Sequence, residues 1–402
     1  MRVRACLFRR KLIGPVSYCG ATKFITSRCG YPAFSSASER QLGRLKLVAA
    51  AVEGSIMANV KRSGRSSRPG KAQRKKPVHA GVVGLGLMGK SIVTCLLSSG
   101  ATVTGLDISS SARRRTRPQV LAMLKEMRSE GLLKLDPARA VRRLTVTTDF
   151  ARFAKCDVMI ESITEDFRAK KETFEKIESV VPADALIASN TSAIPISDLQ
   201  KGCRHPERVI GMHWAEPCHV TRFMEIICGS ATSDESAERA VRFAQTWGKE
   251  PALVRKDVRG FIANRISYAM FREAIHLVES GVATVEDVDS SLRNDVGFWI
   301  TFAGPFRYMD LMGVPAYKLV MKDLLPDLDC SKEVPELIRK VVDSGGKGVS
   351  TRRGFYHYTP QQAKRWQELF LKFNYDIRKL AMKYPVDAGD RSAPKQKKRR
   401  DR

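Results

Sequence analysis

The middle of the chain alternates between short apolar runs and longer stretches in which apolar residues recur at helical spacing. Runs typical of buried strands occupy residues 78–84, 101–107, 144–147, 156–161, 185–189, 208–213, 223–228 and 251–254. Helical spacing separates several of these runs, notably over residues 88–98, 111–131, 167–180 and 234–247. Strands that alternate with helices favour a largely parallel sheet covered on both faces. We therefore expect a doubly wound α/β domain over residues 77–257.

Beyond residue 257 the pattern changes to apolar positions at helical spacing, for example Ile262, Ile266, Met270 and Ala274. Strand signals are few there, so we expect an all-α C-terminal domain over residues 258–385. A length of 402 residues is sufficient for two such domains. No apolar run reaches the roughly eighteen residues that a membrane-spanning helix needs, so we expect no membrane span.

The formal net charge of +28 is concentrated at the two ends of the chain. Residues 1–77 hold 18 of the 70 Lys and Arg residues but only two acidic residues. The first 30 residues are rich in Arg and contain no acidic residue, which is typical of a mitochondrial presequence. We therefore expect residues 1–76 to be a basic extension that directs the protein to mitochondria. A plain basic extension on a cytoplasmic protein is the alternative.

The C-terminal segment over residues 386–402 is a second basic tail. No aromatic residue is interleaved with its charges, so we expect a solvated tail and no nucleic-acid binding. The nine cysteines are scattered, without a Cys-x-x-Cys pair or a His/Cys cluster at zinc spacing. This distribution predicts free thiols and no metal site.

A glycine-rich turn lies between the first predicted strand and the first predicted helix, and it contains Gly84, Gly86, Leu87, Met88 and Gly89. The first glycine permits a tight turn, the second lets a pyrophosphate approach the backbone, and the third allows close packing of helix on strand. The free N–H groups of the helix N-terminus favour an anion. Together these features predict a Rossmann-like phosphate-binding turn.

Asp107 ends the next predicted strand, 18 residues after Gly89. A carboxylate at this position accepts hydrogen bonds from the adenine ribose hydroxyls and repels a 2′-phosphate. The Rossmann-like unit therefore predicts NAD as the cofactor.

His213 and Glu225 are the candidates for acid–base chemistry. His213 ends a predicted strand at the carboxyl edge, where open α/β sheets bind ligands, and histidine titrates in the range of a general base. Glu225 lies twelve residues further on in an apolar strand, where a buried carboxylate needs a partner. In a pair, Glu225 would fix the tautomer of His213 and stabilise its imidazolium. We therefore predict a dehydrogenase with a His213/Glu225 catalytic pair.

Several motifs in this order resemble the 3-hydroxyacyl-CoA dehydrogenase family. They are the sequence Ser-Asn-Thr-Ser at 189–192, the His213/Glu225 spacing, Gly-Phe-Ile-x-Asn-Arg at 260–265, Glu-Ser-Ile-Thr-Glu-Asp-Phe-Arg-Ala-Lys at 161–170, Gly-Pro-Phe at 304–306 and Gly-Phe-Tyr at 354–356. The resemblance covers roughly residues 78–358.

The resemblance implies a function and a set of site residues. The implied reaction is the NAD-dependent oxidation of an L-3-hydroxyacyl-CoA to the 3-ketoacyl-CoA in fatty-acid β-oxidation, with His213 as the base. Ser192 and Asn264 are implied to hydrogen-bond the substrate. Glu165 and Lys170 are implied to contact the ribose and nicotinamide of NAD. A homodimer formed through the helical domain is also implied.

Two residues depart from the family's pattern. Leu85 stands where Ala or Gly is commoner, and Glu216 stands where the family usually has an asparagine. Either the substrate is not an ordinary acyl-CoA, or a basic neighbour such as Arg222 neutralises Glu216. Two other functions therefore stay open, namely a related NAD-dependent dehydrogenase of a small hydroxy acid without CoA, and a non-catalytic nucleotide- or RNA-binding protein. The His213/Glu225 pair argues against the second.

Overall fold

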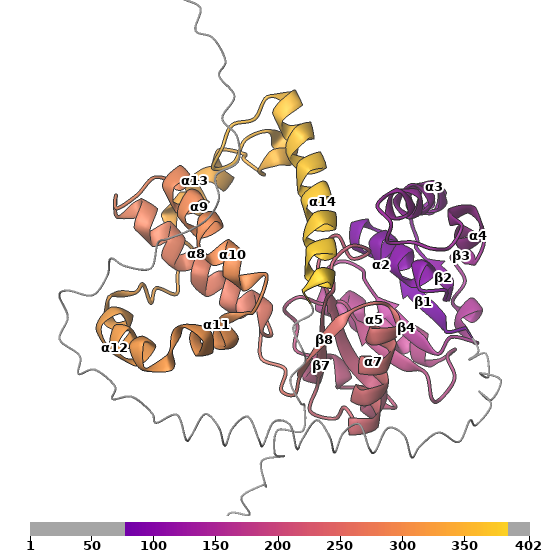
Figure 1. Ribbon diagram of the computed structural model, residues 1–402. Helices are drawn as coiled ribbons and strands as arrows, with labels where there is room; N and C mark the ends of the chain where they lie inside the picture. The colour runs from indigo at the N-terminus through magenta and orange to yellow at the C-terminus, as the bar shows by residue number, and fades with distance from the viewer. Residues whose placement is uncertain (1–76, 385–402) are drawn as a thin grey trace, which may run out of the picture. The chain divides into compact units, whose positions relative to one another are not determined.

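The computed structural model describes residues 77–384, coloured in Figure 1. The predicted presequence and the predicted basic tail over residues 386–402 lie outside the described residues. None of the helices formed by residues 77–384 combines the length and apolar character of a membrane-spanning segment.

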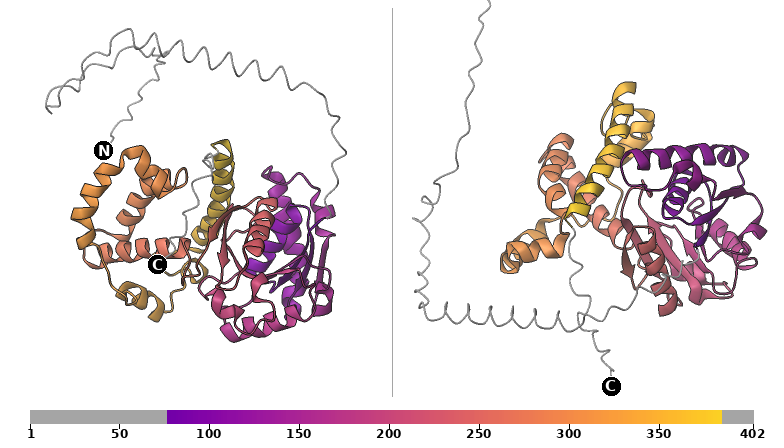
Figure 2. Two further views of the ribbon diagram at one scale, coloured as in Figure 1. Left: turned by 90° about the horizontal axis from the view of Figure 1, so that it is seen from below. Right: turned by 45° about the vertical axis from the view of Figure 1, so that its right-hand side comes forward.

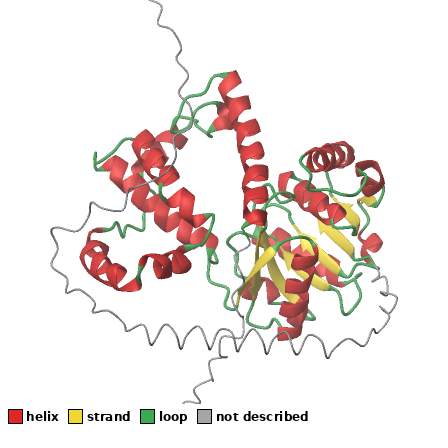
Figure 3. Cartoon of the chain, in the orientation of Figure 1, coloured by secondary structure: helices red, strands yellow, loops and turns green. Residues whose placement is uncertain are grey.

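An eight-stranded sheet is the centre of the N-terminal part of the described chain (Figures 1 and 3). Its order is β3-β2-β1-β4-β5-β6-β7-β8, and every neighbouring pair is parallel except β6 and β7, which are antiparallel. The strands are β1 (His79–Val83), β2 (Thr102–Leu106), β3 (Leu144–Thr147), β4 (Val158–Glu161), β5 (Leu186–Ser189), β6 (Val209–Trp214), β7 (Phe223–Cys228) and β8 (Glu250–Val254).

Helices cover both faces of this sheet because alternate strand residues point to opposite sides. Ala80 and Val82 of β1 belong to one apolar core, whereas Val83 belongs to the other. The first core also contains residues of α2 (Leu87–Ser98), α3 (Ser110–Ser129) and α7 (Asp234–Thr246), and the second contains residues of α5 (Phe167–Glu178) and α6 (Ile196–Gln200). The predicted doubly wound, Rossmann-like sheet is thereby confirmed.

Two features of this sheet domain differ from the sequence prediction. The short helices α4 (Pro137–Val141) and α6 are present but were not predicted. The strand predicted over residues 208–213 ends one residue later, so that His213 is the penultimate residue of β6.

Up to residue 384, helices and short 3-10 turns follow β8, with two isolated β-bridges that involve Arg353, and this confirms the predicted all-α C-terminal region. The helices are α8 (Ala263–Glu279), α9 (Val285–Asn294), α10 (Val296–Ile300), α11 (Pro305–Met312), α12 (Val314–Leu324), α13 (Glu336–Asp343) and α14 (Pro360–Lys383). Thr284 and Thr359 form capping boxes at the starts of α9 and α14. Within the described residues, none of the positions in α8 to α13 is buried, although many are apolar.

The last helix, α14, packs against the sheet domain. Its Tyr375 is 1% exposed and belongs to the first apolar core. Arg378 Nη1 donates to the carbonyl oxygen of Val220 over 2.6 Å, and Lys379 pairs with Glu130 at the end of α3. Figure 2 shows the yellow α14 beside the indigo helices of the sheet domain.

Candidate active site

The glycine-rich turn has the backbone geometry that a bound pyrophosphate requires. Gly84 has φ +93°, and a Cβ there would lie 2.4 Å from the carbonyl oxygen of Ser162. A Cβ on Gly89 would lie 1.8 Å from the carbonyl oxygen of Gly84, because α2 packs closely on the turn. A Cβ on Gly86 would meet nothing within 4 Å, so this glycine faces open space. Two glycines thus shape the turn, and the third leaves room for a phosphate beside the N–H groups of α2.

The side chains after the turn mark the start of α2. Leu87 is 71% exposed at the N-terminus of this helix, and Met88 is partly buried against the first core.

Asp107 directly follows β2 and lies against the same turn. Its Oδ2 accepts a hydrogen bond from the Leu85 N–H over 2.8 Å, and its Oδ1 accepts one from the Ser109 N–H over 2.7 Å. Arg113 donates to the backbone carbonyls of Asp107 and Ile108. The turn and this carboxylate therefore fit the pyrophosphate and the adenine ribose of NAD.

His213 and Glu225 lie directly opposite each other on the antiparallel pair β6 and β7. His213 Nδ1 lies 2.8 Å from Glu225 Oε2. The two residues are 7% and 1% exposed, so the pair is shielded from water. With Nδ1 bound to the carboxylate, Nε2 is the ring nitrogen that can accept a proton from a substrate hydroxyl.

The second carboxylate oxygen of Glu225 holds the N-terminus of α8. Its Oε1 accepts hydrogen bonds from the N–H groups of Ile262 and Ala263, each over 2.9 Å. Phe261, just before them, has φ +51°, an uncommon conformation for a bulky residue, and its ring packs 5.7 Å from that of His213. Burial disfavours the ionised carboxyl, but the hydrogen bonds from His213 and from the two amides lower the pKa of Glu225 below its ordinary value. Glu225 is therefore anionic and can stabilise an imidazolium.

Ser192 and Asn264, the predicted substrate-binding residues, are brought together. Asn264 Nδ2 donates to the carbonyl oxygen of Ser192 over 3.2 Å. Both residues line a cavity of about 1270 Å³, whose wall also carries Arg259, Arg265 and Arg272. A large cavity with several guanidinium groups suits an extended, anionic ligand.

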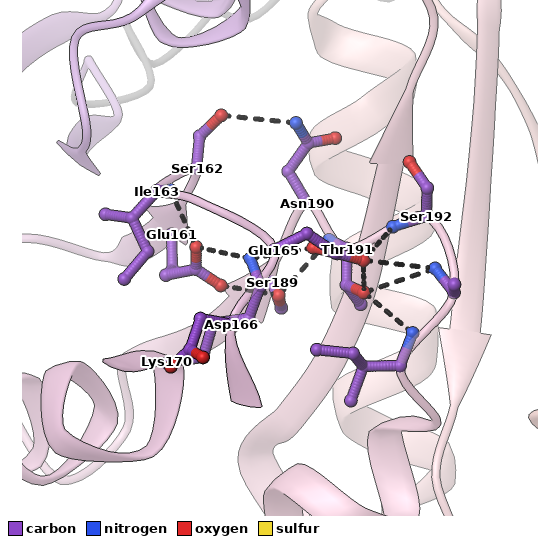
Figure 4. A network of polar contacts seen from close by, with 12 residues as sticks. Glu161, Ser162, Ile163, Glu165, Asp166, Lys170, Ser189, Asn190, Thr191 and Ser192 are labelled. Carbon is purple, nitrogen blue, oxygen red and sulfur yellow. Dashed lines mark hydrogen bonds and ion pairs between the residues drawn. The ribbon is translucent and has the colours of Figure 1, made fainter. Parts of the chain in front are cut away.

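Glu165 and Lys170 form part of a polar network at the ends of β4 and β5 (Figure 4). Lys170 is 1% exposed, and its Nζ lies 2.8 Å from Glu161 Oε1 and 3.2 Å from Glu165 Oε2. Glu165 Oε1 also accepts hydrogen bonds from the N–H groups of Ser192 and Ala193. Partial burial opposes ionisation, but hydrogen bonds from Thr191 and the ammonium of Lys170 lower the pKa of Glu165. Glu165 therefore anchors the loop that carries Ser192, and contact of either residue with NAD stays a prediction.

Three further residues of this network lie in the motifs quoted above, although the sequence assigned no role to any of them. Ser189 Oγ donates to Glu161 Oε2 over 2.6 Å, and Asn190 Oδ1 accepts the N–H of Trp214 over 3.0 Å. Glu161, Ser189 and Asn190 thus tie together the ends of β4, β5 and β6. Glu161 closes an apolar strand, which is the signal that singled out Glu225, so the same reasoning could have found it.

Glu216 is not neutralised by Arg222, because Arg222 pairs with Glu250 instead. Its partly enclosed surroundings raise the pKa of Glu216, and hydrogen bonds with Ser91 and Cys218 oppose this effect. A raised pKa lets a carboxyl take up a proton at a higher pH, and a protonated carboxyl donates a hydrogen bond as an amide does. The charge of Lys249, whose Nζ donates to the carbonyls of Cys218 and Thr221, also lowers the pKa of Glu216.

Two family profiles match most of the described chain. The 3-hydroxyacyl-CoA dehydrogenase NAD binding domain matches residues 79–258, and the 3-hydroxyacyl-CoA dehydrogenase C-terminal domain matches residues 260–358.

Curated relatives match over a similar extent. A 5-formyl-3-hydroxy-2-methylpyridine 4-carboxylate 5-dehydrogenase of Mesorhizobium japonicum is 31% identical over 71% of this chain and 92% of its own. A probable 3-hydroxybutyryl-CoA dehydrogenase of Deinococcus radiodurans is 33% identical over 69% of this chain and 99% of its own.

Solved structures have the same fold. A 5-formyl-3-hydroxy-2-methylpyridine 4-carboxylic acid 5-dehydrogenase, described as an NAD+-dependent dismutase, has a TM-score of 0.72 at 29% identity, covering 76% of this chain and 99% of its own. The (S)-3-hydroxybutyryl-CoA dehydrogenase of Ralstonia eutropha has a TM-score of 0.58 at 30% identity, covering 71% of this chain and 100% of its own. These matches, together with the cofactor-binding turn, exclude the alternative of a non-catalytic nucleotide- or RNA-binding protein. The chain belongs to the 3-hydroxyacyl-CoA dehydrogenase family and is an NAD-dependent oxidoreductase.

Proposed function

We propose that this protein oxidises the secondary alcohol of an L-3-hydroxyacyl-CoA to the 3-keto thioester, as in fatty-acid β-oxidation. The observation that carries this proposal is the buried His213/Glu225 pair at the edge of the sheet. NAD, when bound, accepts the hydride. His213 Nε2 takes the hydroxyl proton, and the Glu225 carboxylate holds the Nδ1–H and stabilises the resulting imidazolium.

The cavity beside Ser192 and Asn264 supports an acyl-CoA as the substrate. Its guanidinium groups, on Arg259, Arg265 and Arg272, suit the phosphates of CoA. The side chains of Ser192 and Asn264 have hydrogen-bonding groups for the substrate oxygens. The supporting relatives are those named as 3-hydroxybutyryl-CoA dehydrogenases.

A small hydroxy acid or aldehyde without CoA is the second candidate substrate, because Glu216 replaces the asparagine that is usual in the family. The solved structure with the TM-score of 0.72 is that of a pyridine-carboxylic acid dehydrogenase, against 0.58 for the hydroxybutyryl-CoA enzyme. We expect kcat/KM to be highest for acetoacetyl-CoA or a longer 3-ketoacyl-CoA, with NADH as the reductant. Higher kcat/KM for a free keto acid or an aromatic aldehyde would reject the acyl-CoA proposal. The same substrates tested with Glu216→Asn show whether Glu216 determines the preference between CoA thioesters and free acids or aldehydes.

We also propose that the protein is a homodimer formed through its helical domain. Large apolar side chains of α10, α11 and α12 are exposed, including Phe298 at 75%, Phe306 at 79% and Leu319 at 71%. A second copy of the same surface would remove them from water, as an isologous interface does. Sedimentation should give a dimer for the wild type, a smaller species for Phe306→Glu, and a dimer for the control Lys155→Glu, which changes an exposed residue of the sheet domain. A monomeric wild type would contradict the proposal.

We propose a mitochondrial location, on the basis of the acid-free, Arg-rich first 30 residues. Residues 1–76 fused to a fluorescent reporter should carry it into mitochondria. A reporter that stays in the cytoplasm would contradict this location.

A further inference from the structure

The buried network at the ends of β4 and β5 contains two carboxylates and one ammonium group (Figure 4). Glu161 is 0% exposed and Lys170 is 1% exposed, whereas the side chain of Glu165 is 42% exposed. Burying charged side chains costs free energy unless each charge is paired with an opposite one. Here one positive charge faces two negative charges. The network therefore differs from a simple, neutral salt bridge.

Hydrogen-bond donors surround both carboxylates. Glu161 accepts from Lys170 Nζ, from Ser189 Oγ and from the N–H of Ile163, over 2.8, 2.6 and 2.7 Å. Glu165 accepts from Lys170, from the Thr191 hydroxyl and from the N–H of Ser192. Every one of these partners donates, so both oxygens of each carboxylate act as acceptors, as those of a carboxylate anion do. With Lys170 as an ammonium, the network holds a net charge of −1.

The strand order places this charge beside the reacting end of the cofactor. The phosphate turn follows β1, and His213 lies near the end of β6, with β4 and β5 between them. The turn is in close contact with the end of β4, because a Cβ on Gly84 would strike the carbonyl oxygen of Ser162. Neighbouring strands lie about 4.8 Å apart, so a cofactor that reaches from the turn to His213 crosses the ends of β4 and β5.

We propose that the Glu161/Lys170/Glu165 network raises the affinity of the enzyme for NAD+ relative to its affinity for NADH. The nicotinamide ring is positively charged in NAD+ and uncharged in NADH, so a fixed negative charge near it stabilises only the oxidised form. In a partly buried site a single charge several ångströms away changes affinity by about tenfold. Glu161 is therefore a specificity-determining residue that acts through its charge, without touching the cofactor. This inference depends on NAD binding and is independent of the substrate proposed above.

The test measures binding of each cofactor form in the absence of substrate. The full-length protein is titrated with NADH by fluorescence, and with NAD+ by calorimetry, for the wild type and three variants. Glu161→Gln removes one negative charge with little change of shape. Ser189→Ala breaks a hydrogen bond of the same network but leaves its charge unchanged. Glu165→Gln removes the negative charge of the half-exposed carboxylate. It provides the same test if Glu161→Gln does not fold.

The expected result is a change in the ratio of the two dissociation constants. In Glu161→Gln and Glu165→Gln, the Kd of NAD+ should rise about tenfold relative to that of NADH. In Ser189→Ala, the two constants should change by the same factor, so their ratio stays at the wild-type value. A wild-type ratio in both charge-removing variants would overturn the proposal, as would an equal shift of the ratio in Ser189→Ala. Because no substrate is present, a wrong acyl-CoA assignment would leave this result unaffected.

Discussion

Replacing Glu225 by glutamine removes one charge from a buried pair and keeps its shape. A glutamine can satisfy the N–H groups of Ile262 and Ala263 with its carbonyl oxygen only if its NH2 group turns toward His213. The ring nitrogen Nδ1 must then accept a hydrogen bond, so the ring proton moves to Nε2. A histidine in this tautomer cannot take the hydroxyl proton of the substrate.

The magnitude follows from the distance between the two groups. His213 Nδ1 and Glu225 Oε2 are 2.8 Å apart and almost fully buried. Charges centred about 4 Å apart at an effective dielectric constant of about 20 attract each other by about 4 kcal/mol. Loss of this attraction from the transition state lowers the rate about a thousandfold.

We therefore expect the kcat of Glu225→Gln to fall about a thousandfold, while the Kd of NAD changes little. NADH formation at saturating substrate gives kcat, and calorimetry gives the affinity for NAD. Glu250→Gln is the matched control, because Glu250 is 65% exposed and its pair with Arg222 lies on the surface. If Glu225→Gln retained more than about a tenth of the wild-type kcat, the reasoning about charge and tautomer would be refuted.

Three further substitutions test the turn and the surroundings of the site. Gly86→Val should fold normally but weaken NAD binding, because its side chain enters the open space above the turn, whereas Gly89→Ala should destabilise the fold through its clash with Gly84. Calorimetry and thermal unfolding separate these outcomes, and undiminished NAD affinity in Gly86→Val would contradict the placement of the pyrophosphate. Burial lowers the pKa of His219 from 6.5 to about 4. Below pH 6.5 this histidine therefore binds a proton in the unfolded chain but stays neutral in the folded protein. The neutral His219 therefore contributes fully to stability above about pH 7, and this contribution should fall by about 2 kcal/mol by pH 5. His219→Asn should lack this component in denaturant unfolding, and equal acid sensitivity in variant and wild type would count against it.

Much of the sheet was predictable because its central strands are buried on both faces and read as apolar runs. The predictions over residues 144–147 and 223–228 agree with β3 and β7 at both ends. The helices α4 and α6 have five residues each, which is less than two turns and too short for a period to show. Local caps, such as Asp136 before α4, define such helices instead.

Part of the site was predictable from the cost of burying a carboxylate. Glu225 in an apolar strand required a partner, and the antiparallel register provides His213. The second partner of Glu225, the N-terminus of α8, depends on how the two domains meet, which no local pattern encodes. The enclosure of Lys170 between Glu161 and Glu165 is likewise a consequence of tertiary packing. The role of His213 as the base stays a prediction.

The most direct test of that role is NADH formation from L-3-hydroxybutyryl-CoA by His213→Gln, with NAD affinity measured on the same preparation. Loss of the only proposed base should lower kcat by about a thousandfold or more, while NAD binds as tightly as in the wild type. A variant that binds NAD and still forms NADH at nearly the wild-type rate would contradict the assignment of His213 as the general base.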